Sequence, residues 1–102
     1  VIVARREVVE ANPEAVDAFL ANYAASVEWV NANDADAAQL IAQYGIVEAA
    51  PVAEKALPYC NIVCITGSEM KEKLSGYLQV LSDADAASTG GALPGDDFYY
   101  GA

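Results

Sequence analysis

Two cysteines, Cys60 and Cys64, are the residues whose type and spacing most directly suggest chemistry. They stand in the run LPYCNIVCITG, which Pro58 and Gly67 bracket. A pair of thiols serves as a disulfide, as metal ligands or as a nucleophile, and otherwise as two small apolar core side chains. Each role needs different partner groups, so the rest of the sequence decides between them.

The run around the cysteines has the length and β-branched content of a strand over about residues 59–65. In a strand, Cys60 and Cys64 lie on one face with Cα atoms about 13 Å apart. A disulfide requires Cα atoms within about 7 Å. A metal site or an activated thiol needs further ligands or a base, and the chain has no histidine. The sequence therefore predicts no disulfide and no metal site, and two cysteines buried in a core.

Tyr59 and Asn61 are polar side chains in the same apolar run, on the strand face that they share with Val63 and Ile65. A buried asparagine must be hydrogen-bonded. Its partner is either backbone or a bound small molecule, and the sequence leaves both open. Tyr59 and Asn61 are thus our candidate ligand-binding residues.

Acidic clusters are the other candidates for chemistry: NDAD (33–36), SDADA (82–86) and GDD (95–97). The stretch SDADAASTGG begins like a calcium loop but lacks the glycine at position six and the glutamate at position twelve. We interpret these clusters as helix caps and solvated turns. Because no phosphate-binding loop is present either, the sequence predicts no catalytic residue, no cofactor and no enzyme activity in this chain.

Composition narrows the range of partners. The chain has 102 residues, 55% of them hydrophobic, which favours a packed domain over disorder. Five Lys and Arg against 15 Asp and Glu give a net charge of −10, which argues against nucleic acid and against anionic membrane surfaces. No apolar run is long enough to span a bilayer.

Hydrophobic periodicity predicts a mostly α chain with one or two short strands. We expect a single segment, 1–102, without a dividing linker. Trp29 lies off the apolar stripe of its helix, on a face rich in alanine. Either this helix packs between two layers, or Trp29 is partly exposed. The predicted elements are a strand at 1–5, helices at about 13–32, 35–44 and 49–57, a strand at about 59–65, a helix at about 69–82, and a tail, 83–102, anchored by aromatic side chains.

Taken in order, the segments NPEAVDAFLANYAASVEWVNAN, YGIV, EKALPYCNIV, GSEMKEKLSGYLQVL and GGALPGDDFYY resemble the C-terminal third of solute-binding proteins of bacterial ABC importers. The likeness is to the nitrate/sulfonate/taurine-type group, which is also described as resembling thiamine-pyrimidine synthases. It covers essentially the whole chain. The positions that match the order of that group are Val1–Arg5, Pro13–Leu20, Trp29–Asn33 and Ala37–Ala42.

The resemblance implies the C-terminal segment of an α/β type II periplasmic-binding fold, whose two lobes close on a small molecule. It implies a solute-binding component that delivers a small molecule to an ABC permease, located outside the cytoplasm as a periplasmic or lipid-anchored protein. The upstream part of the same protein would complete the lobe and carry the targeting signal. We expect such an upstream part because Val1 falls inside a strand-like run.

Two other functions stay open. One is a fragment of a pyrimidine-synthase-like enzyme of that fold, although such enzymes rely on a histidine and this chain has none. The other is a stand-alone helical module that self-associates through the strand edge at 1–5 and the Trp29 face. A segment of a larger lobe predicts that these surfaces are exposed, whereas a self-sufficient module predicts that they are covered.

Overall fold

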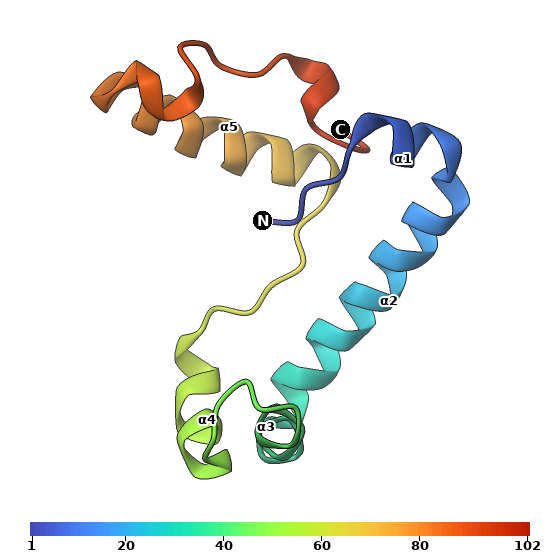
Figure 1. The fold of residues 1–102 in the computed structure, drawn as a ribbon, viewed down its shortest axis with the longest axis vertical. Coiled ribbons are helices and arrows are strands. Elements are labelled where there is room, and N and C mark those ends of the chain that lie inside the picture. The colour runs from blue at the N-terminus through green and yellow to red at the C-terminus, as the bar shows by residue number, and fades with distance from the viewer. The chain divides into compact units, whose positions relative to one another are not determined.

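Helices joined by turns and irregular segments make up the chain in the computed structural model, which describes residues 1–102 (Figure 1). The chain forms two compact units, Val1–Cys64 and Ile65–Ala102. The α-helices are α1 (Arg6–Ala11), α2 (Pro13–Ala32), α3 (Asp34–Gln43), α4 (Ala50–Ala56) and α5 (Gly67–Ala84). Three short 3-10 helices are η1 (Leu57–Tyr59), η2 (Ala86–Thr89) and η3 (Asp96–Phe98).

The predicted α/β character is wrong, because neither expected strand forms. Residues 1–5 have no regular structure, and 59–65 holds the end of η1 followed by irregular backbone. A strand is held by hydrogen bonds to a neighbouring strand, and this chain supplies none. The chain is a small all-α protein, and its structure is not a segment of an α/β type II periplasmic-binding fold.

The first two helices meet at Asn12. The Nδ2 of Asn12 donates to Val8 O at 3.0 Å and so caps the end of α1, while its side chain makes no capping hydrogen bond at the start of α2. Asn33 repeats this pattern, since its Nδ2 donates to Trp29 O at 2.8 Å at the end of α2. In both places the asparagine closes the preceding helix and the next helix begins directly after it.

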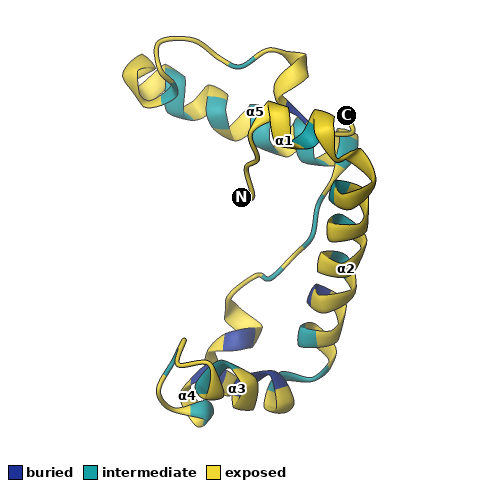
Figure 2. Cartoon of the chain, turned by 45° about the vertical axis from the view of Figure 1, so that its right-hand side comes forward, coloured by how far each residue is buried: buried dark blue, intermediate teal, exposed yellow.

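The core of the first unit is small and lies where α3 packs against α4 and η1 (Figure 2). Its buried members are Ala37, Ala38, Ala53 and Leu57. Because three of the four are alanines, the helix backbones approach closely and little apolar area is buried. Partly buried residues surround this cluster: Val30, Ile41, Val47, Ala50 and Ile62.

One side-chain hydrogen bond fixes the segment that follows η1. Asn31 Nδ2, near the end of α2, donates to Ile62 O at 2.9 Å. The contact spans 31 residues of sequence within the first unit. It holds the backbone just after Asn61, which has a positive φ of 51°.

Replacing Asn31 with alanine is expected to release this segment. A net hydrogen bond is worth about 0.5–1.5 kcal/mol, so amide exchange around Ile62 should accelerate about two- to tenfold, as hydrogen–deuterium exchange would measure. Asn22→Ala, the same change at another exposed position of α2, should leave that exchange unchanged. Equal protection of Ile62 in both variants would show that packing, rather than this bond, holds the segment.

The second unit folds its tail back onto α5. Tyr99 is its buried aromatic residue, and its ring meets Phe98 edge-on with centroids 5.2 Å apart. Lys71 of α5 lies 6.0 Å from the centroid of Tyr99 and pairs with Asp96 at 3.0 Å. Tyr99 therefore anchors the tail, as predicted for the aromatic residues of this region.

Two glycines of α5 are expected to respond in opposite directions to alanine. Gly67 has a φ of 61°, and a Cβ there would lie 3.3 Å from Gly101 O. Gly76 has open space around it within the helix. Gly67→Ala should lower the free energy of unfolding by about 1–2 kcal/mol, and Gly76→Ala should raise it by about 0.5–1 kcal/mol. Urea unfolding, monitored by circular dichroism, measures both changes. If both variants raised or both lowered the free energy of unfolding, the opposite roles given to Gly67 and Gly76 would be wrong.

Candidate functional site

The structure places both candidate ligand residues in the exposed segment at and just after η1. Tyr59 is 85% exposed and ends η1. Asn61 is exposed as well, in the left-handed backbone region. Neither residue lines either of the two hollows described below. The expected placement on one strand face depended on a strand that does not form.

The cysteines differ from the predicted core pair. Cys60 is exposed, Cys64 is half-buried, and both thiols are free. Cys60 Sγ donates to Ala56 O at 3.3 Å, one turn earlier in the chain. The prediction that both would be buried is therefore wrong, because it assumed that a sheet would cover this run.

Two of the acidic side chains, Asp85 and Asp83, accept hydrogen bonds from residues close to them in the chain. Asp85 Oδ1 accepts the Ala87 N–H at 3.0 Å and caps η2, which confirms the capping interpretation for that residue. Asp83 Oδ1 accepts from Gln79 Nε2 at 2.7 Å on the surface of α5. No group of three or more Cys, Asp or Glu side chains gathers as a metal site. None of the helices has both the length and the apolar character needed to cross a membrane.

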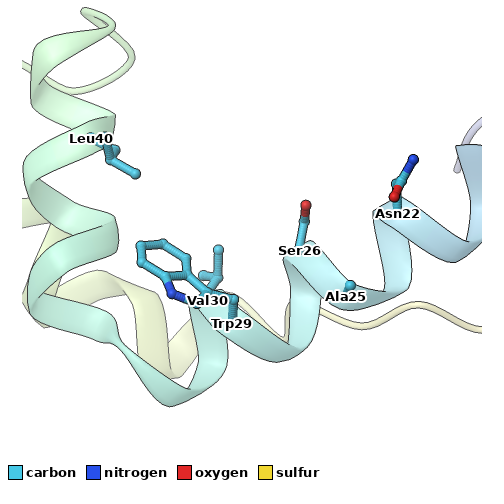
Figure 3. Close-up of a pocket in the computed structure, with 6 residues that line it drawn as sticks. All are labelled: Asn22, Ala25, Ser26, Trp29, Val30 and Leu40. Atoms are coloured by element: carbon cyan, nitrogen blue, oxygen red, sulfur yellow. The ribbon is translucent and has the colours of Figure 1, made fainter.

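A hollow with a volume of about 650 Å³ lies between α2 and α3 in the first unit (Figure 3). We call it the Trp29 hollow. Its walls come from two helices, because Leu40 of α3 faces the side of α2 that carries Trp29. The lining residues are Asn22, Ala25, Ser26, Trp29, Val30 and Leu40.

Apolar side chains form the inner end of the Trp29 hollow. The Trp29 ring, Val30 and Leu40 gather where α2 gives way to α3, while Asn22 and Ser26 point to the same open side further along α2 (Figure 3). Trp29 and Leu40 are each 42% exposed. An indole and a leucine left this open are partly hydrated, and an apolar surface that covered them would gain free energy by burial.

Helical spacing predicts one wall of this hollow but not the other. It sets Trp29 off the apolar stripe of its helix, and the structure buries Val27 of α2 while leaving Trp29 open. The other wall is Leu40 of α3, for which the sequence predicts no role at a site. Helical spacing shows which residues share a face, but it does not show which faces a neighbour covers.

A second, smaller hollow of about 390 Å³ lies within the second unit. Leu78 of α5 forms one side and the tail forms the other, including Leu93 and Phe98. Phe98 is half exposed, although the sequence predicts it as a tail anchor. No charged residue lines this hollow.

Comparisons of the chain with models of protein families, with curated proteins and with solved structures return no match. The likeness to solute-binding proteins thus rests on the sequence segments quoted above.

Proposed function

We propose that the chain is part of the solute-binding component of an ABC import system, which captures a small molecule and delivers it to a permease. In this proposal the helices are completed by another part of the same protein, outside the cytoplasm, and the solute is held by both together. The chain contributes no catalytic group. The observation that carries the proposal is the large apolar surface that the helices leave uncovered.

Uncovered apolar side chains occur along the whole first unit. Val1 and Val3 are almost fully exposed, and Phe19 and Tyr23 stack with ring centroids 5.9 Å apart while remaining accessible. Large exposed apolar surfaces on soluble proteins mark places that another polypeptide covers. The exposed 1–5 run and Trp29 are what we expect of a segment that belongs to a larger protein.

The sequence likeness indicates which polypeptide would cover these exposed apolar side chains. In the resembled group, the corresponding segment packs against an upstream part of the protein, and that upstream part makes most of the ligand contacts. Tyr59 and Asn61 remain our candidates for reaching the solute, because their exposed side chains are available to a neighbouring surface.

Native mass spectrometry of the protein purified under non-denaturing conditions tests this proposal, with the denatured mass recorded beside it. The expected result is the 10.7 kDa chain holding a larger fragment of the same protein or a small molecule non-covalently, with the extra mass lost on denaturation. A ligand-free monomer that unfolds in a single cooperative transition would overturn the proposal, since it would show that the chain completes its own fold.

A stand-alone helical module that dimerises is the second candidate, and the exposed aromatic pair on α2 favours it. Phe19 and Tyr23 sit one turn apart, a spacing that suits packing against a second helix. Light scattering behind size exclusion would then report twice the chain mass, falling to one chain mass in a Phe19→Ser, Tyr23→Ser double variant. If the unsubstituted chain already has the mass of a single chain, this candidate is excluded.

A further inference from the structure

We infer that the Trp29 hollow docks one amphipathic helix of a partner polypeptide, and that lysine or arginine residues flank the apolar face of that helix. The inference goes beyond the proposed import function and does not rest on it, because it concerns the chemistry of the docking helix and not the protein that carries it. Three properties of the first unit support it.

The first property is shape. The Trp29 hollow lies in the corner where α2 meets α3, with Trp29 on one wall and Leu40 on the other (Figure 3). A groove between helices accepts a third helix, whose apolar side chains at positions i, i+3, i+4 and i+7 enter it. On the α2 wall, the small side chains of Ala25 and Ser26 let a partner backbone approach closely.

The second property is the uncovered anchor. Trp29 is the only tryptophan of the chain, and its ring is partly exposed at the inner end of the hollow. Aromatic side chains in such positions commonly carry much of the binding free energy of an interface, provided that the partner excludes water around them. Val30 and Leu40 lie beside the ring and would close around an inserted aliphatic side chain.

The third property is charge, and it identifies the partner. Between Arg6 and Lys55 the chain has no lysine or arginine, so both walls of the hollow belong to helices without a cation. Asp36 is exposed one turn before Leu40, on the same face of α3. Nine acidic residues occupy this interval: Glu7, Glu10, Glu14, Asp17, Glu28, Asp34, Asp36, Glu48 and Glu54.

None of these nine acidic residues lines the hollow itself, but Asp36 stands at its rim beside Leu40, and neither wall helix carries a cation to offset it. Such a rim attracts a basic segment and repels an acidic one. A second copy of this chain would bring its own net charge of −10 against the same surface. Like charges facing each other across an interface cost affinity. The charge pattern thus favours a Lys/Arg-flanked partner helix over self-association at this hollow.

A peptide display selection tests the inference directly. The library consists of tryptophan-free amphipathic helices of about 20 residues, with apolar residues fixed at helical spacing and Lys, Arg, Glu, Asp and Gln equally allowed at the flanks. The expected result is enrichment of Lys and Arg at the flanks. Each selected peptide, made synthetically, should move the fluorescence emission of Trp29 to shorter wavelength, because the indole leaves water.

Matched variants localise the binding. Ala25→Arg places a long cation in the hollow and should weaken the peptide Kd at least about tenfold, a loss of about 1.4 kcal/mol. Ala21→Arg makes the same change at an exposed position of α2 outside the hollow and should change Kd less than about twofold. Leu40→Gln, on the opposite wall, should weaken binding as well. Circular dichroism of each variant verifies that its helix content is unchanged.

Four results of the peptide experiments would overturn the inference. They are a selection that yields no binder, enriched peptides with neutral or acidic flanks, equal losses in Ala25→Arg and Ala21→Arg, and an emission maximum that does not move on binding. A dimer of the chain that Ala25→Arg dissociates would overturn it too, since the hollow would then belong to a second copy.

Discussion

Leu57→Ala is expected to unfold the helices of the first unit at room temperature. Leu57 is the largest member of the buried cluster, 7% exposed, and the other three members are alanines that cannot fill the space it leaves. Truncation of a buried leucine to alanine lowers the free energy of unfolding by about 2–5 kcal/mol. A core this small has little stability to lose, because small domains bury a limited share of their surface.

Far-ultraviolet circular dichroism and urea unfolding measure this loss, with amide exchange of α3 and α4 as the local readout. Val52→Ala provides the matched control, since Val52 is 58% exposed on the neighbouring helix α4. That variant should change the free energy of unfolding by less than about 0.5 kcal/mol. If both variants unfold at the same urea concentration, the α3–α4 cluster is not what holds the first unit together.

Tyr99→Ala is expected to detach the tail of the second unit from α5. Tyr99 is 7% exposed, meets Phe98 edge-on and lies beneath the ammonium group of Lys71. Removing a buried aromatic ring costs about 3–5 kcal/mol, more than the exposed pair of Lys71 and Asp96 could offset. The tail should therefore lose its protection while α5 retains part of its helix.

Hydrogen–deuterium exchange of residues 92–102 gives the direct measurement, and chymotrypsin cleavage after Phe98 gives an independent one. Tyr77→Ala is the control, because Tyr77 belongs to α5 and is 62% exposed. In the Tyr77→Ala variant, the amides of residues 92–102 should exchange at the rate measured for the unsubstituted chain. A protected tail in the Tyr99→Ala variant would mean that the ion pair and η3 suffice to hold it.

The sequence predicted helices well where periodic apolar residues run for many turns. The helix expected at about 13–32 corresponds to α2, and the one expected at about 69–82 lies within α5. The helix α1 was not predicted, because the run VIVARREVV was interpreted by its β-branched residues alone. Such residues favour strands only when a neighbouring strand is there to pair with them.

The candidate site depended on the same missing neighbour. Tyr59 and Asn61 share a face only if the segment forms a strand. Because no strand forms, they are two exposed residues that no common face brings together. The sequence placed Trp29 correctly off the main apolar stripe, because the faces of a helix follow from residue spacing within that one segment and require no neighbouring element. Its pairing with Leu40 in one hollow depends on the turn at Asn33, whose geometry no local pattern specified.

The positions of the lysine and arginine residues determine where trypsin can cut this chain. Trypsin cuts after lysine and arginine, and four of the five such residues lie within helices: Arg6 in α1, Lys55 in α4, and Lys71 and Lys73 in α5. Cleavage at these four requires local helix opening. Digestion after Arg6 and Lys55 would leave α2 and α3 as one intact fragment, residues 7–55. The order in which tryptic fragments appear therefore ranks the opening of α1, α4 and α5.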